Sequence, residues 1–179
     1  MTARADAMPG QKAQPGARQK SQGTIQVLEF VLGSELFAID LFDVKEVVEY
    51  TTITKLPNVP SYIRGIIDLR GEITSIIDLK QRLNIRDASE KPAESSRIVV
   101  LDDKITRSKI GILVDDVTSV STFEPDQVDY TSATVTKDDS AIIGIIKRRI
   151  RVKEKEKNEL IIWIDITKLL SEIDERLSV

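Results

Sequence analysis

The chain contains neither cysteine nor histidine among its 179 residues. Without thiols it can form no disulfide framework, thiol nucleophile or thiolate metal site. Without imidazole, Ser-His-Asp catalysis, histidine-bound metals and histidine proton shuttles are also excluded. We therefore expect a protein that is not an enzyme and that needs no cofactor or metal.

Aromatic side chains make up only 4% of the chain, and no apolar run approaches the roughly 18 residues that a membrane-spanning helix requires. The formal net charge of -3 disfavours wholesale binding to nucleic acid or to an anionic membrane. We therefore expect no direct membrane insertion and no nucleic-acid partner, and the absence of cysteine suits a reducing cytosol.

From Thr24 onwards the chain consists of short runs rich in Val, Ile and Leu that are separated by turn residues, a pattern typical of β-strands. Residues 1–24 contain Gly, Pro, Gln and basic residues instead, and are predicted to be a disordered tail. The predicted strands are 26–32, 36–39, 63–69, 73–78, 97–101, 109–114, 142–146, 149–153 and 160–164.

Two short helices are predicted as well. Residues 43–48 place Val44, Val47 and Val48 on one helical face, and residues 167–177 show the spacing of an amphipathic helix at the C-terminus. Residues 153–159 alternate in charge and are predicted to be a solvated hairpin loop.

A weak internal repeat relates two parts of the chain. Gly65-Ile66-Ile67 followed by Ile76-Ile77-Asp78-Leu79 resembles Gly144-Ile145-Ile146 followed by Trp163-Ile164-Asp165-Ile166. Because each half would bury little on its own, we expect a mainly β fold of two five-stranded halves that share a hydrophobic seam. The halves are placed at about 25–88 and 95–179, joined by a polar connector, and exchange of strands between them is left open.

Two charged constellations have simple structural explanations. The adjacent acidic pairs at 102–103, 115–116 and 138–139 point to opposite faces of a strand, which favours turn and capping roles over a metal site. The five basic residues between Lys147 and Lys153 raise the alternative of an oligonucleotide-binding barrel. No aromatic residue lies between 131 and 162 for bases to stack on, so a solvated strand face is favoured.

The most informative segment contains two Arg-Gly dipeptides, Arg64-Gly65 and Arg70-Gly71, within two β-branched runs. Glycine weakens a strand unless the backbone bulges or is approached closely. An arginine beside each glycine presents a planar cation next to exposed backbone, which suits recognition of another protein.

Residues 58–79, which include both dipeptides, resemble the CheW family of chemotaxis coupling proteins. The likeness includes Phe37-Ala38-Ile39-Asp40 and Val44-Lys45-Glu46-Val47 upstream and residues 110–117 and 164–170 downstream, so that it covers nearly everything from about 25 to 172. The resemblance implies two SH3-like five-stranded β-barrel subdomains packed over a common seam. It also implies a non-enzymatic adaptor, located in the cytoplasm at membrane-associated receptor arrays.

The partners implied by the resemblance are the regulatory domain of the histidine kinase CheA and the cytoplasmic hairpin tip of methyl-accepting chemoreceptors. The positions that match those associated with receptor binding in the family are Val44, Glu46, Arg64, Gly65, Arg70 and Gly71. A CheV-like adaptor or a detached kinase regulatory domain is the alternative within signalling. We favour the stand-alone adaptor, because the chain shows no receiver or kinase domain.

The chain departs from the family pattern at two positions. Ser75 stands where the family usually has proline, so a backbone N–H is freed and we expect a looser strand. Asp68 stands where asparagine is commoner, and its spacing predicts a same-face pair with Arg70.

Overall fold

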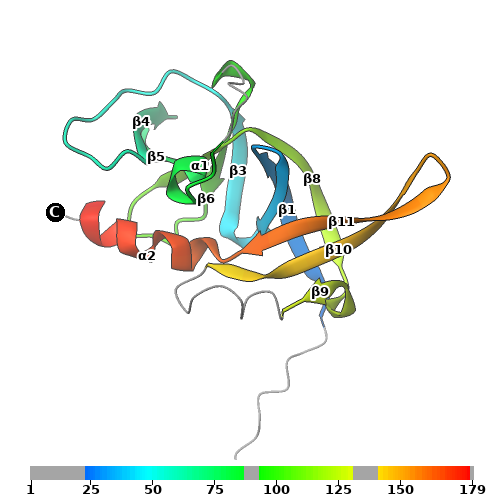
Figure 1. The fold of residues 1–179 in the computed structure, drawn as a ribbon. Helices are drawn as coiled ribbons and strands as arrows, with labels where there is room; N and C mark the ends of the chain where they lie inside the picture. The colour runs from blue at the N-terminus through cyan, green and yellow to red at the C-terminus, as the bar shows by residue number, and fades with distance from the viewer. Residues whose placement is uncertain (1–22, 87–92, 131–140, 178–179) are drawn as a thin grey trace, which may run out of the picture.

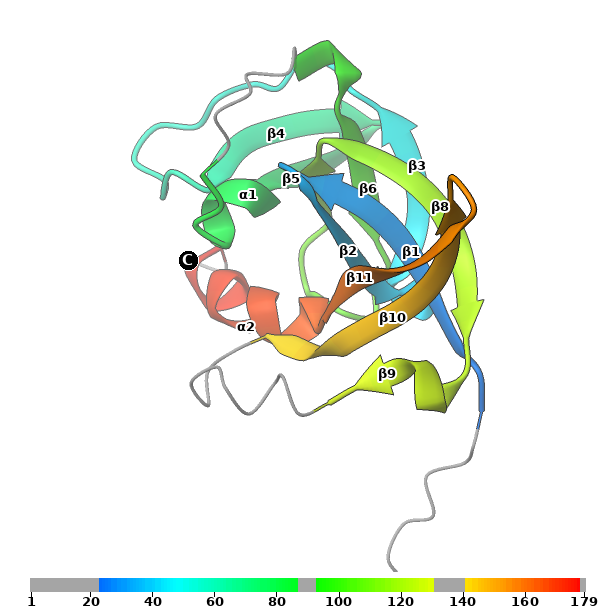
Figure 2. The same ribbon diagram turned by 45° about the vertical axis from the view of Figure 1, so that its right-hand side comes forward.

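The computed structural model describes residues 23–86, 93–130 and 141–177, and its strands form two curved sheets (Figures 1 and 2). The six-stranded sheet has the order β8-β1-β2-β11-β10-β9 and the five-stranded sheet the order β3-β6-β7-β5-β4. Each sheet combines strands from both sides of residues 87–92. The six-stranded sheet contains β1 (Ile25–Leu32), β2 (Glu35–Asp40), β8 (Asp116–Phe123), β9 (Val128–Asp129), β10 (Ile142–Val152) and β11 (Lys155–Ile164). The five-stranded sheet contains β3 (Val44–Glu49), β4 (Ile63–Leu69), β5 (Glu72–Asp78), β6 (Arg97–Leu101) and β7 (Ile110–Val114).

The helices are few and short. They are α1 (Leu79–Arg82), α2 (Ile166–Leu177) and the 3-10 turns η1 (Leu41–Asp43), η2 (Ala93–Ser95) and η3 (Pro125–Gln127). Asp78 begins α1 by accepting a hydrogen bond from the Gln81 backbone N–H, and Asp165 accepts one from Lys168 at the start of α2. Within the described residues no helix is long and apolar enough to cross a bilayer.

The buried apolar residues form three clusters. One lies within the six-stranded sheet around Phe123, Ile146 and Trp163, and another lies within the five-stranded sheet around Ile67 and Ile98. The largest cluster joins strands of both sheets to the buried side of α2, with Phe30 and Leu170 among its members. The predicted mainly β fold, the shared hydrophobic seam and the C-terminal helix are thereby confirmed, although one sheet has six strands.

The helix predicted at 43–48 is wrong, because Val44–Glu49 is β3. Its residues alternate between half-buried and exposed, and it pairs with β6 from Val44 opposite Leu101 to Glu49 opposite Arg97. Six residues are too few to separate a period of 3.6 from a period of 2. Pairing with the buried strand β6 decides the outcome.

The loop predicted at 153–159 is also wrong. β10 continues to Val152, and β11 begins at Lys155, so that only Lys153 and Glu154 form the turn. Both turn residues have positive φ angles, 47° and 62°, as a tight two-residue hairpin requires. The alternating charges therefore belong to a strand that has solvent on both faces.

The internal repeat has a structural counterpart. The register of β4 shifts between Ile63 and Gly65, and the register of β10 shifts between Ile142 and Gly144. In the first hairpin Asp78 N donates to Tyr62 O over 2.7 Å, and in the second Asp165 N donates to Ala141 O over 2.7 Å. The hairpins β4–β5 and β10–β11 are therefore built alike, each with a bulge at the glycine and a capping aspartate at the exit.

Candidate functional site

Arg70 and Gly71 form the tip of the β4–β5 hairpin. Leu69 pairs with Glu72, and the two residues between them have φ angles of 55° and 83°. Positive φ at both central positions is the geometry of a two-residue hairpin turn, and glycine adopts it without a steric penalty. The Gly71 N–H donates to Asp68 Oδ1 over 2.7 Å, and this hydrogen bond stabilises the turn. Arg70 therefore lies at the tip of the hairpin.

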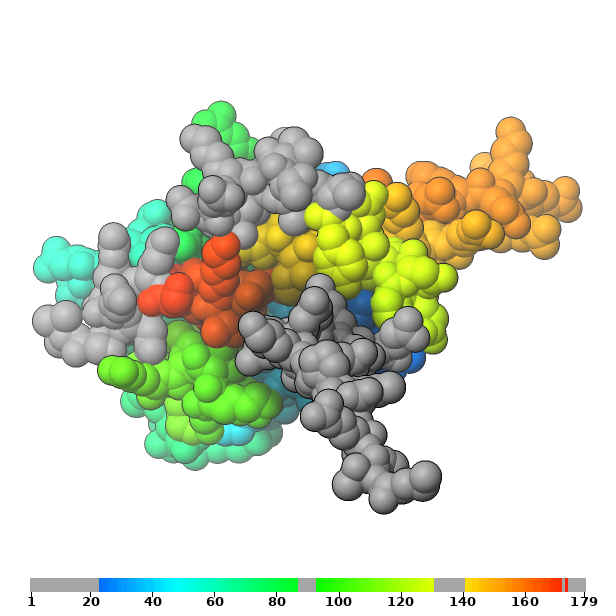
Figure 3. All heavy atoms as spheres, turned by 90° about the horizontal axis from the view of Figure 1, so that it is seen from below, coloured from blue at the N-terminus to red at the C-terminus, as the bar shows by residue number. Residues whose placement is uncertain are grey.

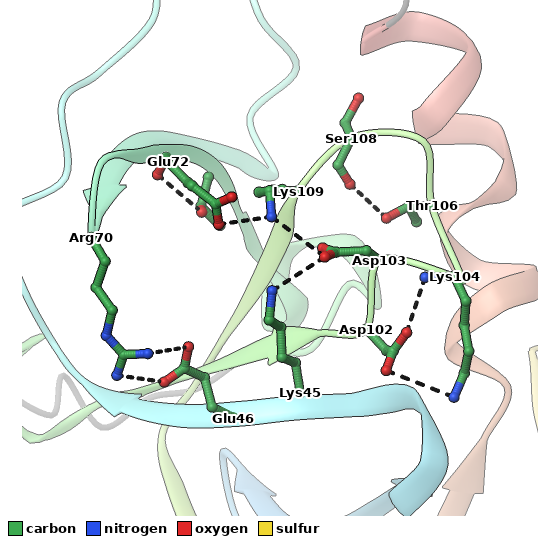
Figure 4. Close-up of polar contacts among 11 residues, drawn as sticks. Lys45, Glu46, Arg70, Glu72, Asp102, Asp103, Lys104, Thr106, Ser108 and Lys109 are labelled. Atoms are coloured by element: carbon green, nitrogen blue, oxygen red, sulfur yellow. Dashed lines mark hydrogen bonds and ion pairs between the residues drawn. The ribbon is translucent and has the colours of Figure 1, made fainter.

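The guanidinium of Arg70 pairs with the carboxylate of Glu46 on β3. The two contacts are Nη2 to Oε2 at 2.9 Å and Nη1 to Oε1 at 3.2 Å, a bidentate geometry (Figure 4). β3 and β4 are the two edges of the five-stranded sheet, so the pair spans the gap between them. The Arg70 side chain is 75% exposed and that of Glu46 is 23% exposed. Such an exposed pair adds little stability, but it presents an oriented cation to a partner.

A row of alternating charges continues from this pair along the same cleft. Asp103 accepts from Lys45 at 3.2 Å and from Lys109 at 3.4 Å, and Lys109 Nζ also lies 2.7 Å from Glu72 (Figure 4). The hydrogen bond from Lys45, helped by that from Lys109, lowers the pKa of Asp103. The hydrogen bond to Glu72, with that to Asp103, raises the pKa of Lys109. The lining of the cleft comprises Lys45, Glu46, Leu69, Arg70, Glu72, Thr74, Val100, Asp103 and Lys109.

Sequence reasoning missed Lys45, Asp103 and Lys109 as members of this cleft. Their proximity depends on the pairing of β3 with β6, which brings Val44 opposite Leu101. The helix predicted for this segment concealed that register. Recognising a β-branched strand at 44–49 would have placed Lys45 next to the turn that contains Asp103.

Arg64 lies at the other end of the hairpin from Arg70. Its Nη1 is 3.8 Å from Oδ2 of Asp78, the buried aspartate that caps α1. The six residue steps from Arg64 to Arg70 along the strand correspond to a separation of roughly 20 Å. The structure therefore does not bring Arg64 together with Arg70 and Glu46.

Gly65 is buried, and its neighbour is another part of the same chain. A Cβ at this position would lie 2.0 Å from the carbonyl oxygen of Thr54, and φ is 141°. Gly65 therefore has a role inside the fold, and its part in receptor binding stays a prediction. Gly71 has open space where a Cβ would stand, so that it remains available to a partner.

Val44 lies at the start of β3, two residues before Glu46. It is half-buried and packs against the largest apolar cluster. The structure thus brings Glu46 and Arg70 together at one cleft, with Gly71 beside Arg70 in the turn and Val44 on the same strand as Glu46. Gly65 supports the hairpin from within the fold.

Both expectations about the departures from the family pattern are wrong. Asp68 bonds the Gly71 N–H, and Arg70 turns to Glu46 instead of to Asp68. The Ser75 N–H is not free, because it donates to Lys109 O over 2.9 Å beside the parallel pairing of β5 with β7. The strand after the second Arg-Gly dipeptide is therefore tied into the sheet.

The other predicted constellations take structural roles. Asp102 accepts the Lys104 N–H in a turn, and Asp115 accepts the Gly33 N–H and pairs with Lys80. The pair at 138–139 lies outside the described residues. No three potential metal-ligating side chains of the described residues form a group.

Comparison with known proteins shows the family of the chain. The sequence profile of the CheW-like domain family matches residues 26–174. The chemotaxis protein CheW of Treponema pallidum is 31% identical over 148 residues, 82% of each chain, and a probable chemotaxis protein CheW of Rhizobium etli is 31% identical over 76% of this chain and 88% of its own. The crystal structure of the scaffolding protein TtCheW from Thermoanaerobacter tengcongensis superposes with a TM-score of 0.65 at 32% identity, covering 83% of this chain and 93% of the other.

Proposed function

This chain belongs to the CheW-like family of chemotaxis adaptors, and we propose that it couples chemoreceptors to the histidine kinase CheA. Its two partners would be the cytoplasmic hairpin tip of the receptors and the regulatory domain of the kinase. The protein would then work in the cytoplasm at membrane-associated receptor arrays.

The observation that carries the receptor assignment is the Arg70–Glu46 pair. It joins β3, at one edge of the five-stranded sheet, to the tip of the β4–β5 hairpin at the other edge, and leaves the arginine at the surface. A guanidinium held by one carboxylate keeps further donors for a second acceptor on a partner. We assign Val44, Glu46, Arg70 and Gly71 to the contact surface.

Arg64 and Gly65 enter the proposal in a different way. Arg64 pairs with the cap of α1, and Gly65 lets Thr54 close the sheet edge, so both would set the position of the hairpin. Their substitution should affect coupling through the shape of the hairpin and the stability of the protein.

The remaining charges of the cleft suit a partner of defined polarity. Three cations and three carboxylates alternate between Arg70, Glu46, Lys45, Asp103, Lys109 and Glu72. Such a pattern sets the register and orientation of a docked helix more than it adds affinity.

Reconstitution tests the proposal. Purified chain, CheA and receptor-containing membranes are mixed, and kinase phosphorylation and co-sedimentation are measured together. We expect the kinase to sediment and to be activated only when all three components are present. Full activation of the kinase by receptors in the absence of this chain would contradict the proposal.

A further inference from the structure

The β10–β11 hairpin extends well past the sheet to which it belongs. Its counterpart β4–β5 spans 14 residues from Gly65 to Asp78, whereas Gly144 to Asp165 spans 22 residues. The additional length stands out from the body as a two-stranded projection (Figures 1 and 3). We name residues 147–159 the ribbon arm.

Both edges of the ribbon arm are uncovered in the part of the chain that the structure describes. β9 pairs with β10 only at Ile145 and Ile146, because the chain before β9 turns away in η3. β2 pairs with β11 only at residues 161–163. A two-stranded ribbon in water is marginally stable by itself, and its free edges can accept a third strand.

The base of the ribbon arm is fixed to the body by charged groups. Arg148 Nη1 lies 2.7 Å from Oε1 of the fully buried Glu29 on β1, and Arg148 also donates to Glu159 across the hairpin. These contacts hold the base of the arm against β1, so that a partner would meet a partly preformed surface there.

The charge of the arm is opposite to that of the rest of the chain. Residues 147–159 contain seven basic and three acidic side chains, a net charge of +4, whereas the whole chain carries -3. On the β10 side all charged residues from 147 to 153 are basic. Lys147 pairs with Asp129, but Arg149 and Arg151 make no ion pair with any described residue. These two arginines lie on one face of β10, about 7 Å apart.

Protection of the edges against aggregation does not explain this arrangement. Charges of either sign blunt a free edge, and the β11 side has such a mixture in Lys155, Glu156 and Lys157. A single sign along the β10 side selects a partner of the opposite sign.

We propose that the β10 edge of the ribbon arm binds an extended acidic polypeptide segment as an added β-strand. Carboxylates at alternate positions of that segment would meet Arg149 and Arg151, and its backbone would complete the edge beyond β9. The exposed Leu160, opposite Lys147 on the same face, offers a place for one apolar side chain of the partner. This inference is independent of the receptor site.

Two other classes of ligand fit less well. Single-stranded nucleic acid needs aromatic platforms, and residues 147–159 contain none. A membrane surface needs one apolar face, but Val152 and Leu160, 47% and 54% exposed, lie on opposite faces of the arm.

The test uses the full chain and a fluorescein-labelled peptide in which glutamate alternates with threonine or valine. A peptide of the same composition with its glutamates in one block, an oligo-dT strand and anionic phospholipid vesicles are compared with it. The test variant is Arg149→Glu/Arg151→Glu. Its matched control is Lys155→Glu/Lys157→Glu, which makes the same charge change on the other strand of the arm.

We expect the alternating peptide to bind more tightly than the block peptide and to slow hydrogen exchange at residues 147–152. The test variant should lose about tenfold or more in affinity, and the control less than about threefold. Equal losses of peptide affinity in both variants would show that only the net charge of the arm matters, and would overturn the proposal. Absence of peptide binding, or tighter binding of oligo-dT or vesicles than of the peptide, would overturn it as well.

Discussion

Gly65 lies directly against the backbone carbonyl of Thr54 at the edge of the five-stranded sheet. Thr54 N donates to Ile66 O and Ile66 N donates to Thr54 O, both over 2.9 Å, so the segment after β3 closes onto β4. Only a residue without a Cβ can stand at position 65 while this contact is made. The hairpin that presents Arg70 therefore depends on a glycine that packs against another segment of the same chain.

Replacing Gly65 with alanine should destabilise the protein by about 3 kcal/mol, because the new methyl group meets a backbone oxygen and not a flexible side chain. Gly71→Ala is the matched control. Its Cβ meets nothing within 4 Å, and the cost should be about 1 kcal/mol from the positive φ angle alone. Urea denaturation of both variants measures the difference, and equal losses would contradict the role assigned to Gly65.

The buried carboxylate of Glu29 should make Arg148 important for stability. Arg148→Ala leaves a fully buried charge without its partner and should lower the free energy of unfolding by about 3 kcal/mol. In the double variant Glu29→Met/Arg148→Met most of that loss should be recovered, because no charge is left buried. A double variant no more stable than Arg148→Ala would show that shape, and not charge, dominates at this site.

Asp43 should give the protein a specific pH dependence. Burial, followed by the nearby carboxylates of Asp40, Asp165 and Asp102, raises the pKa of Asp43 above its ordinary value of 3.8, and Lys104 offsets only part of this. The native state therefore binds the proton more tightly than the unfolded state does, and ionisation of Asp43 costs stability. The cost is fully present above the folded-state pKa and is absent below about pH 3.8.

The variant Asp43→Asn should accordingly raise the melting temperature at pH 7 by about 1–2 °C, since the group is partly exposed to solvent. The gain should shrink as the pH falls through the folded-state pKa towards 3.8. Thermal unfolding of both proteins from pH 3 to pH 8 measures this. A gain that is the same at every pH would exclude titration of Asp43 as its cause.

Exchanging the charges of Glu46 and Arg70 distinguishes an effect on stability from an effect on receptor binding. In Glu46→Arg/Arg70→Glu the ion pair can form again with reversed polarity, so the thermal transition should match that of the unmodified chain. Binding of a receptor that requires a positive charge at position 70 would still be lost. Normal receptor binding by the exchanged variant would mean that only the bridge between β3 and the hairpin matters.

Much of the fold could be predicted from local patterns. The strands at 63–69 and 97–101 were predicted with their observed bounds, because β-branched runs there end at turn residues. β8 was missed, because this edge strand buries only Phe123 and therefore has little hydrophobic alternation. β3 was misassigned, because its six residues fit two periods and only pairing with β6 separates them.

The candidate site could be predicted only in part. The glycines of the Arg-Gly dipeptides indicated a bulge or a close backbone approach, and Gly65 shows both. The two-residue turn at Arg70-Gly71 was not predicted. The sequence could not show that Arg70 reaches across the sheet opening to Glu46, 24 positions earlier in the chain. It also could not show that Gly65 faces Thr54, because that contact depends on how far the sheet curls.

The most direct test of the central claim is co-sedimentation of Arg70→Glu with receptor-containing membranes, with kinase activity measured in the same samples. Arg86→Glu, the same substitution at an exposed arginine that lies outside the cleft and four residues after the end of α1, is the control. We predict that Arg70→Glu keeps the thermal transition to within about 2 °C, as expected for an exposed pair. We also predict that it sediments with the membranes about tenfold less and fails to activate the kinase, whereas the control behaves normally. Normal sedimentation and normal kinase activation by Arg70→Glu would contradict the assignment of this cleft to the receptor.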